Sequence, residues 1–285
     1  MNLGAHCSTE GGVSRSLERG ASIGCGAVQL FTKNNNRWFE KPLDPDEIRR
    51  FRSAARAFKR RFLISHAGYL INLASPKADL LEKSLASFAD EVRRADAIGL
   101  AGVVVHPGAH VGEGEERGIA RVAQSLDAVF AETPGARPLV LLETTAGQGT
   151  SLGWRFEHLA EIIGRCGSPE RLGVCVDTCH VFAAGYDIRT QDAYEKTMRD
   201  LIRLVGRRRI RAFHLNDSLR ELGSRIDRHE HIGKGKIGLG GFRALLNDPR
   251  FGDRPMVLET HKGKEMKEDV VNLRVLRKLR RAASS

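Results

Sequence analysis

GVVVH (102–106) and LVLLE (139–143) are the two segments that decide the fold of this chain. Both are continuously apolar up to a final polar residue, which is typical of strands in a parallel sheet that is covered on both faces. The intervening segment Glu115–Glu132 predicts a helix, because its apolar residues recur at three- and four-residue steps and form one stripe: Ile119, Val122, Leu126, Val129 and Phe130. The order strand, helix, strand predicts parallel pairing across a helical connection.

The same alternation of short apolar runs and helical patterns continues along all 285 residues. The predicted strands are Asn2–Ala5, Ala27–Leu30, Phe62–Ser65, Gly102–Val105, Leu139–Leu142, Gly173–Val176, Ile210–Phe213 and Pro255–Leu258. Eight such units predict an α/β fold, a single (β/α)8 TIM barrel over residues 1–285 with its active site at the carboxyl ends of the strands. A doubly wound parallel sheet is the alternative.

The residues that directly follow these strands share one chemical character. They are His6, Phe31, His66, His106, Glu143, Asp177, His214 and Glu259. All but the phenylalanine are His, Asp or Glu, although the chain has only 10 His and 35 Asp or Glu among 285 residues. A barrel brings its strand ends to one mouth, so we expect a single cluster of imidazoles and carboxylates. Crowded carboxylates need cations, and nitrogen and oxygen ligands without thiolate favour zinc, with manganese or iron as alternatives at some sites.

Two longer motifs add ligand candidates beyond the strand ends. VDTCH places Asp177 and His180 three residues apart, so both can face the same way on a first helical turn. DRHEH places Asp227 and His229 two residues apart, which puts them on the same side of an extended segment, and His231 has the same spacing. An isolated pair of this kind would be read as a solvated loop, but the ligand-rich strand ends favour a metal site.

Composition narrows the class of protein further. The chain has 46 Lys or Arg against 35 Asp or Glu, and the net charge of +11 favours a polyanionic partner such as nucleic acid. No apolar run approaches the roughly 20 residues that span a bilayer, and MNLGAHCSTEGG lacks the features of a signal peptide. Five scattered cysteines without a C-x-x-C pair argue against a disulfide framework and a cysteine zinc finger. We therefore expect a cytoplasmic protein, associated with the nucleoid if its source is bacterial.

Long motifs in this sequence resemble those of the endonuclease IV family of apurinic/apyrimidinic endonucleases (AP endonuclease family 2). They are GAHCSTEGG (4–12), FTKNNNRW (31–38), SHAGYLINLASP (65–76), HPGAH (106–110), ETTAGQGTSLG (143–153), GVCVDTCHVFAAGYD (173–187), HLNDS (214–218), GSRIDRHEHIGKGKIG (223–238) and LETH (258–261). The resemblance implies a (β/α)8 barrel with three zinc ions that cleaves DNA on the 5′ side of an abasic nucleotide. The products it implies are a 3′-hydroxyl and a 5′-deoxyribose phosphate.

The resemblance also implies which residues hold the metals. His66 and His106 match the imidazoles of one zinc, and Glu143 matches the carboxylate that bridges it to a second. The remaining ligands of the second zinc match Asp177, His214 and Glu259, and those of the third match His180, Asp227 and His229. Glu143 is the residue expected to orient the nucleophile. His6, His110 and His231 lie in matching motifs and are expected near the ligands or facing substrate, whereas His158 and His261 are assigned packing or surface roles.

DNA contacts are predicted in two loops. FTKNNNRW (31–38) carries Lys33, Arg37 and Trp38 among three asparagines, a mixture suited to phosphate contacts and to insertion beside bases. The resemblance implies that this loop, through Asn36 and Arg37, and Tyr69 in the next loop enter the duplex at the abasic site. Extruding an abasic nucleotide from the duplex sacrifices little stacking and no base pairing. Such a contact surface therefore favours an abasic site over an intact nucleotide.

Two other classes of protein are compatible with parts of this pattern. A sugar isomerase or epimerase of the related xylose-isomerase-like barrels would also place His, Asp and Glu at strand ends, but it needs neither nine ligands nor a basic rim. A repair protein that binds abasic sites without cutting is the second, and the complete ligand set argues against it. The predicted partner is duplex DNA containing abasic sites, with no membrane, no obligate protein partner and a monomeric state.

Overall fold

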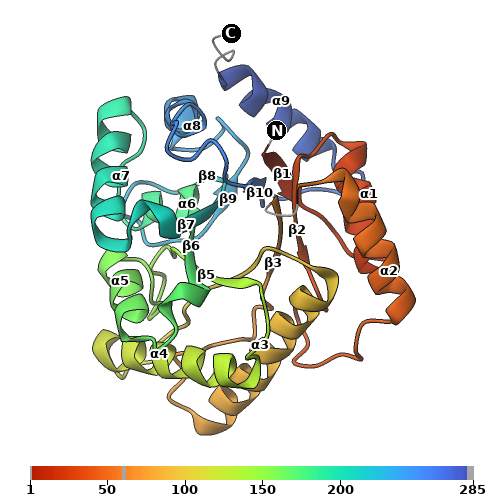
Figure 1. Cartoon of the computed structure of the whole chain (residues 1–285). Coiled ribbons are helices and arrows are strands. Elements are labelled where there is room, and N and C mark those ends of the chain that lie inside the picture. The colour runs from red at the N-terminus through yellow and green to blue at the C-terminus, as the bar shows by residue number, and fades with distance from the viewer. Residues whose placement is uncertain (1, 60–61, 281–285) are drawn as a thin grey trace.

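The strands of this protein close into a barrel inside a ring of helices, as the computed structural model of residues 2–59 and 62–280 shows (Figure 1). The barrel strands are β1 (Leu3–His6), β2 (Ala27–Phe31), β3 (Leu63–His66), β4 (Gly102–Val105), β5 (Leu139–Glu143), β6 (Leu172–Asp177), β7 (Ile210–His214) and β10 (Met256–Leu258). The helices are α1 (Val13–Ser22), α2 (Pro45–Ala54), α3 (Ala78–Ile98), α4 (Glu115–Glu132), α5 (Phe156–Arg165), α6 (Thr178–Ala183), α7 (Gln191–Val205), α8 (Gly238–Leu246) and α9 (Lys267–Leu279).

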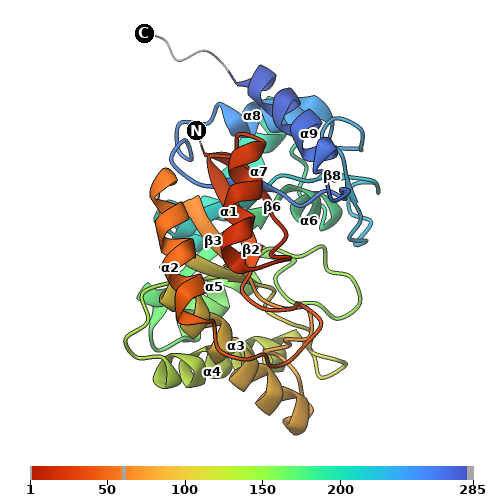
Figure 2. The ribbon, with the colours of Figure 1, turned by 90° about the vertical axis from the view of Figure 1, so that its right-hand side faces the viewer.

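All neighbouring barrel strands run parallel, in the order β1-β10-β7-β6-β5-β4-β3-β2. The ring closes where β1 pairs with β10, with Leu3 opposite Met256. This closure confirms the TIM barrel and excludes the doubly wound sheet, which is open. Figure 2 shows the barrel from the side, with α9 beside α8 at one end of the molecule.

The core has two shells because the strands are buried on both faces, as their continuous apolar runs predicted. Inside the barrel lie Ala27, Phe62, Ile64, Val104, Leu141, Cys175, Ala212 and Val257. The outer shell fills the space between strands and helices, and it includes the whole predicted stripe of α4: Ile119, Val122, Leu126, Val129 and Phe130. The five cysteines are buried free thiols. Within the described residues, no helix combines the length and the apolar character needed to cross a membrane.

Connections after the strands build the mouth of the barrel. Besides the eight barrel strands, β8 (Asp217–Ser218) and β9 (His229–Glu230) form a short antiparallel pair that the sequence analysis did not predict. This pair folds the segment after β7 back over the mouth. It thereby places residues 227–229 next to the barrel strand ends.

Candidate metal centre

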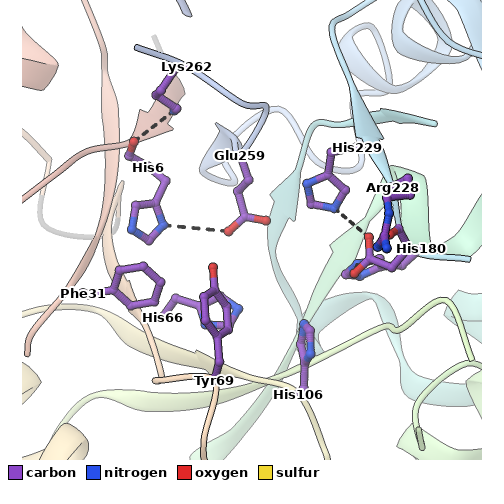
Figure 3. A pocket seen from close by; sticks show the side chains of 11 residues that line it. His6, Phe31, His66, Tyr69, His106, His180, Arg228, His229, Glu259 and Lys262 are labelled. Atoms are coloured by element: carbon purple, nitrogen blue, oxygen red, sulfur yellow. Dashed lines mark hydrogen bonds and ion pairs between the residues drawn. The ribbon is translucent and has the colours of Figure 1, made fainter. Parts of the chain in front are cut away.

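A cavity of about 450 Å³ opens at the carboxyl ends of the barrel strands. Its lining consists of His6, Phe31, His66, Tyr69, His106, His180, Asp227, Arg228, His229, Glu259 and Lys262 (Figure 3). These residues come from most of the strand ends around the ring, as the barrel geometry predicted. Glu143, Asp177 and His214 are almost completely buried beneath the cavity floor.

The first potential ligand group consists of His66, His106 and Glu143. Both imidazoles point to the same carboxylate oxygen: the Nε2 atoms of His66 and His106 lie 3.0 and 3.1 Å from Oε2 of Glu143. His66 is buried, whereas the side chain of His106 is 40% exposed and faces the cavity. The group therefore combines an interior carboxylate with an accessible imidazole.

The second group consists of Glu143, Asp177, His214 and Glu259. Nδ1 of His214 lies 2.8 Å from Oε1 of Glu143, 3.0 Å from Oε2 of Glu259 and 3.8 Å from Oδ2 of Asp177. Glu143 thus turns one oxygen to the first group and the other to the second. A carboxylate in this position can bridge two cations.

The third group consists of His180, Asp227 and His229. The Nε2 atoms of His180 and His229 lie 3.0 and 3.2 Å from the two carboxylate oxygens of Asp227. Both Nε2 atoms are buried, and within the part of the chain that the structure describes neither makes a hydrogen bond. The two buried imidazole nitrogens thus face one carboxylate without forming hydrogen bonds to it. A cation bound between these three side chains would require this arrangement.

Hydrogen bonds on the far side of two imidazoles determine which nitrogen faces the centre. Nδ1 of His66 lies 2.7 Å from the carbonyl oxygen of Ala67, and Nδ1 of His180 lies 2.7 Å from that of Thr144. Since a carbonyl only accepts, each Nδ1 carries a proton and each Nε2 is the nitrogen left to bind a metal. These bonds fix the tautomer that metal coordination needs.

Gln29 and Asn216 are two further polar residues of the centre that the sequence analysis missed. The Gln29 amide donates to Oε1 of Glu259 over 2.5 Å, and its oxygen lies 2.8 Å from Nε2 of His214. The Asn216 amide donates to Asp177 over 2.6 Å and accepts from the Glu259 backbone N–H over 2.9 Å. A glutamine inside the otherwise apolar strand AVQLF was the signal that could have found the first of them.

Neighbouring charges in the centre lower the pKa of a buried carboxyl and raise the pKa of a buried imidazole. Burial alone would raise the pKa of Glu143, but the neighbouring His214 and His106 outweigh it and hold this pKa well below its usual range. Burial lowers the pKa of His229, yet Asp177 and Asp227 raise it to about 9. In the absence of metal the cluster is therefore held together by ionic pairs, with protons in the places that cations would take.

The cysteines next to Asp177 do not change this donor set. Cys179 lies close enough to Asp177 and His229 to form a possible ligand group with them. Burial, however, raises the pKa of the Cys179 thiol to about 12, and that of Cys175 likewise to about 12. Because the thiolate is the form that binds metal, this burial disfavours thiolate ligation, and the three groups described above offer nitrogen and oxygen donors.

Side chains of the loop after β5 help to anchor the segment that carries Asp227. Its backbone N–H donates to the side-chain oxygen of Gln148 over 3.1 Å. Two residues earlier, the guanidinium of Arg225 stacks over the ring of Trp154 at 3.7 Å from its centroid. The indole N–H of Trp154 donates to Glu115 over 3.0 Å, which fixes the ring. The third group therefore depends on the loop after β5 as well as on its own residues.

The histidines expected around the ligands have different surroundings. His6 lines the cavity and its Nδ1 accepts from the Gln29 amide over 3.0 Å. His110 does not line it; its Nδ1 accepts the Gly114 N–H at the start of α4 over 3.0 Å. His231 also lies outside the cavity lining, and its ring packs 4.1 Å from that of His261. Of these three, only His6 faces the space where a substrate would lie.

Among the residues predicted to contact DNA, Tyr69 lies at the cavity mouth with 66% of its surface exposed (Figure 3). Asn36 and Arg37 are exposed but lie outside the cavity lining. Lys33, expected to meet phosphates, is fully buried, so that expectation is wrong. His158, assigned a packing role, is buried in α5 and lies 3.2 Å from Oε2 of Glu115.

Comparisons with known proteins agree with this geometry. The family described as "Xylose isomerase-like TIM barrel" matches residues 17–279. The "Probable endonuclease 4" of Chloroflexus aurantiacus is 53% identical over 277 residues, which cover 97% of each chain. The crystal structure of endonuclease IV from Thermus thermophilus is 39% identical, covers 98% of each chain and superposes with a TM-score of 0.86. A D-tagatose 3-epimerase-like protein shares the fold at a TM-score of 0.74 with 18% identity, covering 98% of this chain and 97% of its own.

Proposed function

Because this chain belongs to the endonuclease IV family, we propose that it hydrolyses the DNA phosphodiester on the 5′ side of abasic sites in duplex DNA. The proposed products are a 3′-hydroxyl and a 5′-deoxyribose phosphate, and the proposed role is base excision repair. The observation that carries the proposal is the convergence of nine His, Asp and Glu side chains in three ligand groups at one cavity. A sugar epimerase needs one or two such groups and no basic rim.

We propose that the three groups hold three zinc ions. The holders would be His66, His106 and Glu143 for the first, Glu143, Asp177, His214 and Glu259 for the second, and His180, Asp227 and His229 for the third. The unpaired imidazole nitrogens of the third group and the carbonyl-fixed tautomers support a cation in the cluster. Mixed nitrogen and oxygen donors suit zinc, with manganese or iron as alternatives at some sites. When bound, the ions neutralise phosphate charge and lower the pKa of coordinated water from 15.7 to about 7.

Glu143 is the proposed catalytic residue. Its carboxylate is completely buried and lies between the first two ligand groups, so its oxygens define where an attacking water would be oriented. The low pKa of this carboxyl keeps it ionised at neutral pH and able to accept hydrogen bonds from that water. A rigid barrel holds it in place before substrate arrives, which lowers the reorganisation that the reaction needs.

The DNA itself would be held around the rim. Arg228 lines the cavity and would supply positive charge for the phosphates, whereas Lys262, which also lines it, is paired with Asp269 over 2.7 Å. We propose that Tyr69, Asn36 and Arg37 contact the duplex at the abasic position, because the tyrosine is exposed at the mouth and the other two are exposed on the adjoining loop. His6, which lines the cavity 3.9 Å from Oε1 of Glu259, would also face the substrate.

The working unit is proposed to be the chain as one endonuclease domain over residues 1–285. It would act on abasic duplex DNA as a monomer, in the cytoplasm or at the nucleoid. We expect this activity to require no obligate protein partner and no membrane.

The proposal is tested by incision of a duplex oligonucleotide with one tetrahydrofuran abasic analogue. The analogue cannot undergo β-elimination, so a lyase would leave it intact. We expect cleavage 5′ to the lesion that is lost on prolonged chelation, returns with zinc and fails in Glu143→Gln. Glu157→Gln, on the exposed face of α5, is the matched control and should cut normally. An uncut but retarded abasic duplex would instead support a binding protein, and neither cutting nor binding would direct the search to sugars.

A further inference from the structure

Lys33 and Glu91 are buried, oppositely charged side chains with no part in the reaction proposed above. Lys33 belongs to the loop of residues 32–44, called here the Asn loop, and Glu91 belongs to α3. The Lys33 ammonium donates to the Trp38 carbonyl oxygen over 3.0 Å and to the Ser87 hydroxyl over 2.9 Å. Lys33 therefore ties the Asn loop to α3 and has no surface left for a phosphate.

One face of α3 presents a row of polar side chains to the Asn loop. Its members stand at helical spacing, so they share one side of the helix: Ser87, Asp90, Glu91 and Arg94. Arg94 donates to Asp90 over 2.7 Å and to the carbonyl oxygens of residues 40 and 41 over 2.9 and 2.6 Å. The backbone of the Asn loop is thus anchored at several points along its length.

Among the four described residues of this row, Glu91 is the one that reaches a second loop; Ser84, one turn earlier on α3, accepts a hydrogen bond from the Asn72 N–H of that loop over 3.1 Å. Glu91 accepts one hydrogen bond from the Thr32 hydroxyl, at the start of the Asn loop, and another from the Gly68 N–H over 3.3 Å. Gly68 belongs to residues 67–77, called here the Tyr69 loop. The two loops also touch directly, since the Tyr69 N–H donates to the Asn35 carbonyl oxygen over 3.2 Å.

Stability alone explains this arrangement poorly. Taking charges out of water is costly, and well-packed apolar residues of similar volume often stabilise a fold as well or better. Burial raises the pKa of Glu91, and Lys33 and the two hydrogen bonds act against that rise. What apolar residues could not supply is an acceptor for the Thr32 hydroxyl and the Gly68 N–H at once.

We propose that Glu91 is a positioning residue that joins the Asn loop and the Tyr69 loop into one preformed surface for the abasic gap in DNA. The inference rests on the proposed function, because both loops carry the residues expected to enter the duplex. Loops that are already ordered in the free protein lose little conformational entropy when they bind DNA. Less of the binding free energy is therefore spent on ordering them, and the affinity is higher. Glu91 would then favour the damaged duplex over an intact one without touching either.

Two substitutions of Glu91 differ in whether they keep its hydrogen bonds to the two loops. Glu91→Gln can still accept from the Gly68 N–H and donate to the Thr32 hydroxyl, so the loops should stay joined. Glu91→Ala removes both bonds. Thr32→Val removes only one and serves if the alanine variant does not fold. The matched control is Thr197→Val, which removes a buried hydrogen bond of 2.8 Å from α7 to the Asp187 carbonyl oxygen.

Hydrogen exchange of the DNA-free protein is the first readout. Glu91→Ala should accelerate exchange in both loops and Thr32→Val chiefly in the Asn loop, whereas Glu91→Gln and Thr197→Val should leave both loops as in the parent. Acceleration confined to one loop in Glu91→Ala, or equal acceleration in Thr197→Val, would overturn the inference. This measurement does not depend on any nuclease activity.

Binding to tetrahydrofuran and intact duplexes in the Glu143→Gln background is the second readout. Glu91→Ala should weaken binding of the abasic duplex about tenfold and of the intact duplex less than about twofold, with Glu91→Gln close to the parent. An unchanged preference in Glu91→Ala would overturn the inference alone. A parent protein without any preference for the abasic duplex would overturn the proposed function and this inference together.

Discussion

Replacing Gln29 by leucine should weaken the second ligand group without altering any of its ligands. The Gln29 amide is completely buried and contacts Glu259, His214 and His6 over 2.5, 2.8 and 3.0 Å. Leucine has a similar volume but no polar atoms. The substitution therefore leaves Nε2 of His214 without its acceptor, and an unsatisfied buried donor costs about 1–3 kcal/mol.

The larger consequence is for the tautomer of His214. In the parent, Gln29 keeps the proton on Nε2 and leaves Nδ1 facing Glu143 and Glu259. Without it, the proton can move to Nδ1, which then donates to a carboxylate and competes with a cation. Loss of such an outer partner typically lowers metal affinity by about 10–100-fold. That range corresponds to about 1.4–2.7 kcal/mol.

The assay is the metal content of Gln29→Leu, the parent and Gln124→Leu after dialysis against a series of zinc buffers. Gln124 is exposed on α4 and serves as the matched control. A Gln29→Leu protein that retains zinc at the same free concentration as the parent would refute the reasoning.

Further predictions address the outer parts of the molecule. Trp154→Leu should reduce the bound metal from the proposed three ions towards two, because the Arg225 stack that supports the third group is lost. Trp154→Phe should retain this stack and the third ion, as metal analysis can test. Burial raises the pKa of Asp248, but hydrogen bonds from Arg250 and a tyrosine outweigh this effect and lower the pKa in the folded protein. The ionised Asp248 therefore stabilises the fold above about pH 4, and this stabilisation is lost as the pH falls through the lowered pKa of the folded state. Urea unfolding should therefore show a shallower acid limb for Asp248→Asn than for the parent. Tyr69→Ala should bind intact duplex as the parent does and lose about tenfold in affinity for the abasic one, measured by fluorescence anisotropy.

The barrel and the ligand clusters could be predicted because they follow from periodic and positional rules. Apolar runs such as GVVV predicted strands covered on both faces, and the register confirms that neighbouring strands are parallel. Polar residues placed directly after those runs had to meet at the mouth once the sheet closed. The predicted strand ends were correct to within about a residue, since the terminal histidine or carboxylate is often the last residue of the strand itself.

Residues whose partners are distant in the chain could not be placed in this way. The sequence around Lys33 looks like an exposed basic loop, and only the polar face of α3, more than fifty residues later, explains its burial. His110 lies in a motif that resembles the family's, yet its ring nitrogen bonds a neighbouring loop N–H and does not reach the cavity. In both cases the missing information was a tertiary contact, which composition and spacing do not contain.

The pairing of β1 with β10 brings the first and the last barrel strand together at the candidate metal centre. Glu259 follows the last barrel strand, and it meets Gln29 and His6 from the first two strands only after the ring has closed. Joining such distant segments carries the largest chain-closure entropy in the fold. A nascent or partly folded molecule therefore lacks the complete centre, so that the capacity to cut DNA would be acquired only by chains that have finished folding.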